Sequence, residues 1–284
     1  MNRGINDHRD AQVKRIVVFG ESHGVGIAAS AEQMGWSEVL GDLIGTFQDG
    51  SIELINRSLG ADVLSKACPL YEEYEGKRPI GIERYRKHII EERPDLVILS
   101  YGYNDLRAGT PIKDFRQDLE TILKDLKSET DALIVLLNTY AIPGEGYENK
   151  SGDTGSGNHW NHGNRETQTL YNLMLNDVSE EQGLLFVDIH GTQVRSPWTF
   201  SSPDGTGDLH ANDLGHRLIA HRIFEALATT SSFLSLKPLK ARAKGKSLWR
   251  HSTKSVEAKL IADFYPDSPE IAKYKKRPAK KGKS

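Results

Sequence analysis

Three polar side chains, far apart along the chain, have the chemistry of a nucleophilic site: Ser22, Asn104 and His210. A serine hydroxyl attacks a carbonyl when an imidazole removes its proton, and the same imidazole can return that proton to the leaving group. An asparagine amide donates hydrogen bonds without carrying charge, which suits an oxygen that becomes negative only in the transition state. Together these residue types indicate acyl transfer.

Ser22 lies in the segment Gly20-Glu21-Ser22-His23-Gly24, directly after the apolar run 16–19. This position predicts a tight turn between a strand and a helix, where the N–H groups of the helix start can face developing negative charge. The five residues also fit G-x-S-x-G, the nucleophile elbow of α/β-hydrolases. That fold has several strands before its serine, whereas one strand precedes Ser22, so we exclude it.

A serine in the first turn after the first strand resembles the first block of SGNH/GDSL hydrolases, with Glu21 in place of the usual Asp. The second block of that family supplies a backbone N–H to the oxyanion hole from a glycine, and residues 56–62, NRSLGAD, resemble it. Here the glycine stands one place early, so both Gly60 and Ala61 are candidate donors. With the amide of Ser22 and the side chain of Asn104, these positions make up the expected oxyanion hole.

Two further blocks follow in the order that the family shows. Residues 102–105, GYND, resemble the G-x-N-D motif, which implies that the Asn104 side chain is an oxyanion donor. Residues 208–216, DLHANDLGH, resemble the block that contains the general base, here His210. The family's acid stands three places before this histidine, where this chain has Gly207. Asp208 is therefore the candidate acid, and a Ser-His dyad oriented by Asp204 or a backbone carbonyl is the alternative.

The resemblance covers residues 15–228 and implies a serine esterase that works through an acyl-enzyme without a cofactor. A short acyl group such as acetyl is expected, because no long apolar lid segment is present, and a carbohydrate ester is expected by analogy alone. The alternative is a catalytically weak binding module of the same fold that contacts an acidic partner through its basic C-terminal tail.

The elements that must position these residues alternate between short apolar runs and longer amphipathic stretches, a pattern typical of a parallel sheet covered by helices. We predict a flavodoxin-like three-layer α/β/α sandwich with a parallel five-stranded sheet. The expected strands are 16–19, 51–56, 96–100, 133–138 and 184–187, and the expected helices are 36–47, 81–93, 113–129, 165–181 and 212–227. The Gly- and Asn-rich segment 143–163 is expected to form a surface loop suited to a lid.

Charge divides the chain into unequal parts. Residues 237–284 hold 15 Lys and Arg against 4 Asp and Glu, although the net charge of all 284 residues is −2. We predict an N-terminal extension (1–14), a catalytic domain (15–230) and a basic extension (231–284) that is partly disordered or contains a short helix. Such a tail favours acidic surfaces or nucleic acid.

Several other classes of protein are disfavoured. The lone Cys68 excludes an internal disulfide framework. The polar N-terminal residues lack the apolar core of a secretory signal or membrane span, so a cytoplasmic protein without membrane contact is expected. The pair His159 and His162 falls short of the three or four ligands that a metal site needs, so no metal is expected.

Overall fold

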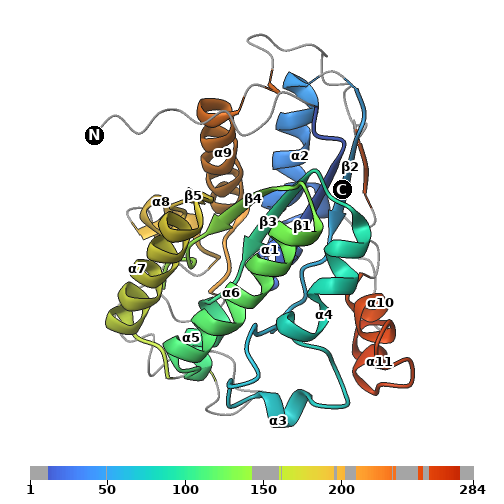
Figure 1. The fold of residues 1–284 in the computed structure, drawn as a ribbon, viewed down its shortest axis with the longest axis vertical. Coiled ribbons are helices and arrows are strands. Elements are labelled where there is room, and N and C mark those ends of the chain that lie inside the picture. The colour runs from blue at the N-terminus through green and yellow to red at the C-terminus, as the bar shows by residue number, and fades with distance from the viewer. Residues whose placement is uncertain are drawn as a thin grey trace.

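A parallel sheet with helices on both faces forms the centre of the computed structural model (Figure 1). The structure describes residues 12–48, 50–142, 160, 162–194, 197–201, 209–231, 233–234, 249–251 and 256–275. The prediction of a flavodoxin-like α/β/α sandwich is confirmed, because the strand order β5-β4-β3-β1-β2 is that of flavodoxin-like sheets. The strands are β1 (Arg15–Gly20), β2 (Ile52–Asn56), β3 (Leu96–Ser100), β4 (Leu133–Leu137) and β5 (Leu185–Val187).

A sixth strand extends this sheet beyond the five that the sequence predicts. The strand β6 (Trp249–His251) pairs in parallel with β2, with Ile52 opposite Trp249. Its three residues lie in the basic C-terminal segment and show no apolar run, so periodicity gave no sign of it. The C-terminal segment therefore contributes to the sheet itself.

The handedness of the crossovers assigns the helices to the two faces. The chain moves one way from β1 to β2 and the opposite way through β3, β4 and β5, and right-handed crossovers then place the first and last helices on one face. Helices α2 (Trp36–Phe47) and α9 (Asp213–Thr230) pack together on this face. The opposite face carries α4 (Gly81–His88), α6 (Ile112–Glu129) and α7 (Arg165–Gln182) (Figure 1).

One predicted helix is shorter than expected. The sequence predicts a helix over 81–93, but α4 ends at His88, where Ile89 adopts φ −127° and ψ −61°. A 3-10 turn, η2 (Ile90–Glu92), follows and ends in Arg93 with a left-handed φ of 50°. The apolar side chain of Ile89 is fully buried in the core, so packing there takes precedence over continuing the helix.

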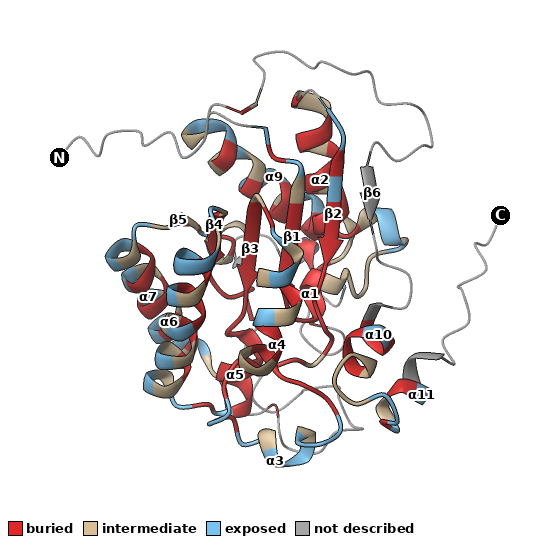
Figure 2. Cartoon of the chain, turned by 45° about the vertical axis from the view of Figure 1, so that its right-hand side comes forward, coloured by how far each residue is buried: buried red, intermediate tan, exposed pale blue. Residues whose placement is uncertain are grey.

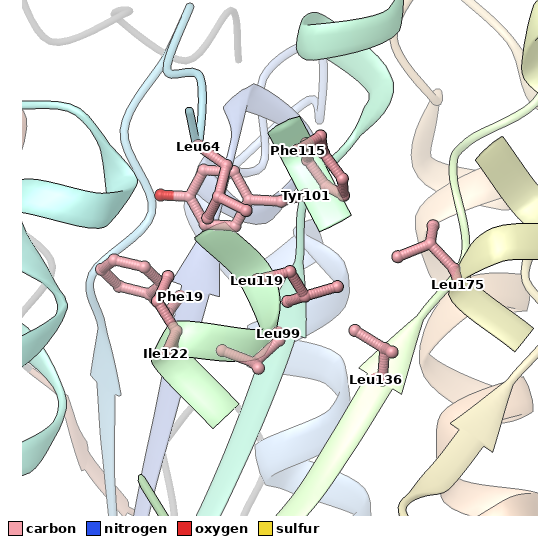
Figure 3. A pocket seen from close by; sticks show the side chains of 9 residues that line it. All are labelled: Phe19, Leu64, Leu99, Tyr101, Phe115, Leu119, Ile122, Leu136 and Leu175. Carbon is pink, nitrogen blue, oxygen red and sulfur yellow. The ribbon is translucent and has the colours of Figure 1, made fainter. Parts of the chain in front are cut away.

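The interior strands β3 and β4 are buried along their whole length, as expected for a sheet covered on both faces (Figure 2). A narrow apolar cavity of about 10 Å³ interrupts the packing between the sheet and helices α6 and α7 (Figure 3). Its walls include Phe19, Leu119, Leu136 and Leu175. A void of this size and polarity is at the limit for one water molecule, so it is a gap in the core.

The C-terminal segment 256–275 packs against the α/β unit. Its helices are α10 (Val256–Ala262) and α11 (Glu270–Lys275), and Leu260 and Ile261 are fully buried in a cluster with Leu59. The Asp263 carboxylate lies 3.2 Å from His88 Nε2 on α4. The basic residues in 235–248 and 276–284, and the N-terminal residues 1–11, lie outside the described part of the chain. None of the described helices is long and apolar enough to cross a membrane.

Candidate active site

Ser22 and His210 meet at the carboxyl edge of the sheet although 188 positions separate them. His210 Nε2 lies 2.7 Å from Ser22 Oγ, a hydrogen-bond distance. Ser22 begins the short helix α1 (Ser22–Val25) directly after β1. The strand order reverses between β1 and β3, and ligands bind at such switch points in open α/β sheets.

Close backbone contacts explain the two glycines beside Ser22. A Cβ atom on Gly20 would lie 2.6 Å from the carbonyl oxygen of Ser100 on β3, and one on Gly24 would overlap Ser58 Oγ. The side chain of Asn56 donates to the Gly24 carbonyl oxygen at 2.7 Å. The turn that contains Ser22 therefore packs tightly between the ends of β2 and β3. This packing fixes the direction of the Ser22 hydroxyl.

The segment that carries His210 is held by backbone pairing and by a helix cap. Ser201 N–H donates to the His210 carbonyl oxygen at 2.9 Å, and Phe200 and Ala211 form an antiparallel bridge. Asn212 then caps α9, accepting a hydrogen bond from Gly215 N–H. These contacts fix the backbone on both sides of the imidazole.

The ring of His23 lies beside that of His210. It stacks on Tyr140, with centroids 3.7 Å apart and 9° between the planes, and its centroid is 4.8 Å from that of His210. Burial, reinforced by the neighbouring His210, holds the pKa of His23 well below its usual value. A neutral, rigid ring therefore forms one wall around the imidazole of His210.

Asn104 lies in α5 (Tyr103–Ala108), directly after β3. Its Nδ2 atom donates to the carbonyl oxygen of Asp62 at 2.9 Å, which leaves one of the two amide hydrogens for another acceptor. The buried carboxylate of Glu21 accepts from the N–H groups of Gly102, at 2.8 Å, and of Asn104, at 3.1 Å. Burial, followed by the charge of Asp105, raises the pKa of Glu21 well above its usual value.

The loop after β2, residues 59–62, brings the two candidate amide donors beside Asn104. Gly60 N–H donates to the Glu257 carboxylate at 2.8 Å, and the Gly60 carbonyl oxygen accepts from Arg78 at 2.5 Å. Ala61 adopts a left-handed φ of 56°, a conformation that favours glycine. Ala61 therefore has a backbone conformation that glycine adopts more readily, and the Gly60 N–H is already bonded to Glu257.

A fully buried ion pair stabilises the loop 59–62. Arg84 on α4 contacts the Asp62 carboxylate at 2.6 Å, and both side chains are inaccessible to solvent. The same guanidinium donates to the Arg57 carbonyl oxygen, and the Tyr101 hydroxyl donates to Asp62 at 2.5 Å. Because an unpaired buried charge is costly, removal of either partner would disturb the base of the loop.

Asp105, which follows Asn104, joins the same loop to α5. Its carboxylate accepts from Leu64 N–H at 2.8 Å and from Ser65 N–H at 3.3 Å. Burial raises the pKa of this carboxyl to about 7. Three buried carboxyl groups, those of Glu21, Asp62 and Asp105, thus connect the segments that carry Ser22, Asn104 and Ala61.

The structure brings Ser22 and His210 together, and it brings Asn104 to the loop of Gly60 and Ala61. The candidate acid Asp208, its alternative Asp204, and His159 lie outside the described residues. So does most of the predicted lid 143–163, although Trp160 is described and is buried in an apolar cluster that includes Ala108. Sequence reasoning missed the buried supports Arg78, Arg84 and Glu257, because arginine and glutamate are usually exposed and no local pattern marks the exceptions.

Comparison with known proteins agrees with this geometry. The sequence pattern of the GDSL-like lipase/acylhydrolase family matches residues 19–218, a span that contains Ser22, Asn104 and His210. The chain belongs to this family. As a GDSL-type acylhydrolase it is a carboxylic ester hydrolase. The curated proteins include no match to the sequence.

Solved structures of GDSL-type and related hydrolases share the fold. The lipase/acylhydrolase from Enterococcus faecalis is 20% identical and superposes with a TM-score of 0.58, over 80% of this chain and 100% of that one. The acetylxylan esterase Axe2 from Geobacillus stearothermophilus is 15% identical with a TM-score of 0.56, over 80% and 99%. The esterase EstA from Pseudoalteromonas sp. is 17% identical with a TM-score of 0.54, over 76% and 97%. At these identities the likeness establishes the GDSL fold alone.

Proposed function

We propose that this GDSL-family protein hydrolyses esters of short acyl groups by two-step acyl transfer, with Ser22 as nucleophile and His210 as general base. The observation that carries the proposal is the 2.7 Å distance between His210 Nε2 and Ser22 Oγ. In the first step Ser22 Oγ attacks the ester carbonyl while His210 takes its proton, and the proton then passes to the leaving alcohol. In the second step a water molecule, deprotonated by His210, releases the acid and regenerates Ser22.

The tetrahedral oxyanion needs donors that are already in place. We assign this role to the amide of Ser22, to the free hydrogen of Asn104 Nδ2 and to the amide of Ala61. The occupied Gly60 N–H and the left-handed φ of Ala61 favour Ala61 over Gly60. Preorganised donors of this kind typically contribute a factor of about 10²–10³ each to the rate.

The acid that orients His210 is proposed to be Asp208, two positions before it. Asp204 is the alternative. The single variants Asp208→Asn and Asp204→Asn separate the two, because removal of the orienting acid lowers kcat by up to about 10⁴-fold in a full triad. A loss confined to Asp208→Asn supports the triad, and unchanged kcat in both variants supports a Ser-His dyad.

A short acyl group, with acetyl on a carbohydrate as the specific candidate, fits the described surroundings of the serine. Ser22 is largely buried, and the apolar cavity lined by Leu119 and Leu175 has no wall formed by Ser22 or His210. Axe2, which shares the fold, is an acetylxylan esterase. The indole of Trp198 is exposed and is a flat surface of the kind on which a sugar ring stacks, and the Trp198 carbonyl oxygen accepts from the side chain of Asn212, two positions after His210.

The test is hydrolysis of p-nitrophenyl acetate, butyrate and octanoate, and acetate release from acetylated xylo-oligosaccharides. Wild type is compared with Ser22→Ala, His210→Ala and a control, His221→Ala, which alters an exposed histidine on α9. We expect kcat to fall by at least about 10³-fold in the first two variants and to stay unchanged in the control. A preference for octanoate would overturn the short-acyl assignment, and full activity in Ser22→Ala would overturn the mechanism.

A further inference from the structure

The C-terminal segment reaches the proposed oxyanion loop through an apolar cluster around Leu59 and through one buried polar side chain, Glu257. This residue lies in the first turn of α10 and is 8% exposed. Its Oε1 atom accepts from Gly60 N–H at 2.8 Å, across 197 positions of sequence. A carboxylate is rarely buried without a specific role, so this contact calls for a function.

Gly60 is held on both sides of its backbone. Glu257 binds its N–H, and the Arg78 guanidinium, which lies 4.7 Å from the ring of Tyr74, binds its carbonyl oxygen at 2.5 Å. The Tyr74 hydroxyl in turn donates to the Ala61 carbonyl oxygen at 2.9 Å. The carbonyl groups of both residues therefore have fixed directions.

The fixed carbonyl of Gly60 determines where the next amide points. A trans peptide is planar, and its C=O and N–H are antiparallel, so the Ala61 N–H must point away from Arg78. A left-handed alanine is strained by about 1 kcal/mol or more, and the surrounding contacts must hold it in place. Without Glu257, the Gly60 N–H would lose its carboxylate acceptor, and the peptide between Leu59 and Gly60 would keep the weaker hydrogen bond of 3.2 Å from Asp62 N–H to the Leu59 carbonyl oxygen.

From these contacts we infer that Glu257 is a positioning residue, which clamps Gly60 so that the Ala61 N–H stays directed at the oxyanion. The inference rests on the proposed function and extends the catalytic unit to residue 257. It assigns the carboxylate a supporting role, in contrast to an autoinhibitory one in which it would occupy the hole. If Glu257 supports the loop, removal of its carboxylate lowers kcat, whereas removal of an autoinhibitory carboxylate would raise kcat.

The variants Glu257→Ala and Glu257→Gln, in the full chain, test the clamp. Glu257→Ala removes the acceptor, and we expect kcat to fall by about 10- to 100-fold with KM changed by less than about threefold, because misplacing a reacting group by 1 Å costs about 10²-fold. Glu257→Gln keeps an acceptor oxygen and should retain most of kcat. The matched control is Asp263→Asn, which weakens the docking of the same segment on His88 and Lys87 without touching Gly60.

Amide hydrogen exchange over residues 57–64 supplies a readout that does not depend on turnover. Glu257→Ala should speed exchange in this segment at least about tenfold, and Asp263→Asn should leave it unchanged. Unchanged kcat and exchange in Glu257→Ala, equal changes in Asp263→Asn, or a gain of activity in Glu257→Ala would each overturn the clamp. An inactive wild type would contradict the proposed function, and the exchange comparison would then decide the clamp alone.

Discussion

Glu21 and Asn104 are joined by a hydrogen bond of 3.1 Å from the Asn104 N–H to the Glu21 carboxylate, which ties the serine turn to the start of α5. The other carboxylate oxygen accepts from Gly102 N–H. We predict that Glu21→Ala lowers the free energy of unfolding by about 1–3 kcal/mol for each buried N–H that loses its acceptor. Because Asn104 then moves relative to Ser22, kcat should also fall by more than about tenfold.

Urea unfolding and ester hydrolysis measure the two effects, with Glu225→Ala on the exposed face of α9 as the control. This control should change the free energy of unfolding by less than about 0.5 kcal/mol. A Glu21→Ala protein with wild-type kcat would show that the carboxylate has no part in placing Asn104.

The proposed role of the Asn104 side chain as an oxyanion donor can be tested by substitution. Asn104→Asp replaces the proposed amide donor by an acceptor of similar shape, so kcat should fall by about 10²–10³-fold while KM changes little. Asn176→Asp, on the surface of α7, introduces the same charge elsewhere and should be neutral. Equal kcat in wild type and Asn104→Asp would remove Asn104 from the oxyanion hole.

His216 predicts a specific loss of stability in acid. Its Nδ1 accepts from Trp36 N–H at 3.3 Å and its Nε2 lies 3.1 Å from the Ile27 carbonyl oxygen, so the buried ring is neutral. Burial lowers its pKa from 6.5 to about 4. Below pH 6.5 the unfolded chain binds a proton that the folded chain does not bind until about pH 4, so stability falls as the pH drops through this window.

The size of this loss can be measured by comparison with His216→Gln, which keeps an amide donor and acceptor. Between pH 7 and pH 4.5 the free energy of unfolding of wild type should fall by about 2–3 kcal/mol more than that of the variant. If the free energy of unfolding had the same pH dependence in wild type and in His216→Gln, His216 would have no part in the loss of stability in acid.

The apolar cavity beside Leu175 is predicted to be a packing gap with no part in substrate binding. Leu175→Ala should lower the free energy of unfolding by about 2–5 kcal/mol, because it enlarges a void. The preference among p-nitrophenyl esters of different length should remain that of wild type. Leu173→Ala, an exposed position on the same helix, should be nearly neutral. A shift toward longer esters in Leu175→Ala would assign the cavity to the acyl group.

The sequence predicts those features that repeat along the chain or follow a strand end. Strands such as 96–100 are continuous apolar runs, and the turns after them place Ser22 and Asn104 at one edge of the sheet. The helix 36–47 is predicted to the residue, since its apolar periodicity stops at both ends. These features depend on the order of apolar and polar residues over short stretches of the chain, which a single sequence contains.

Features that depend on distant contacts could not be predicted in this way. The pairing of β6 with β2 and the contact of Glu257 with Gly60 each join residues almost 200 positions apart. The end of the helix at His88 reflects the burial of Ile89 in a core that the sequence does not display. The choice between Gly60 and Ala61 likewise depends on a backbone angle and a partner, neither of which residue types reveal.

The position of Glu257 downstream of both Ser22 and His210 in the chain has a consequence for biosynthesis. The α/β unit emerges from the ribosome first, and domains generally begin to fold in that order. The loop that carries Ala61 can reach its final support only after α10 has emerged, whereas Ser22 and His210 can already be paired. A nascent chain would thus hold its nucleophile and base in place before its oxyanion loop is secured, so the full rate of hydrolysis would be reached only after α10 has been synthesised and has packed on the loop.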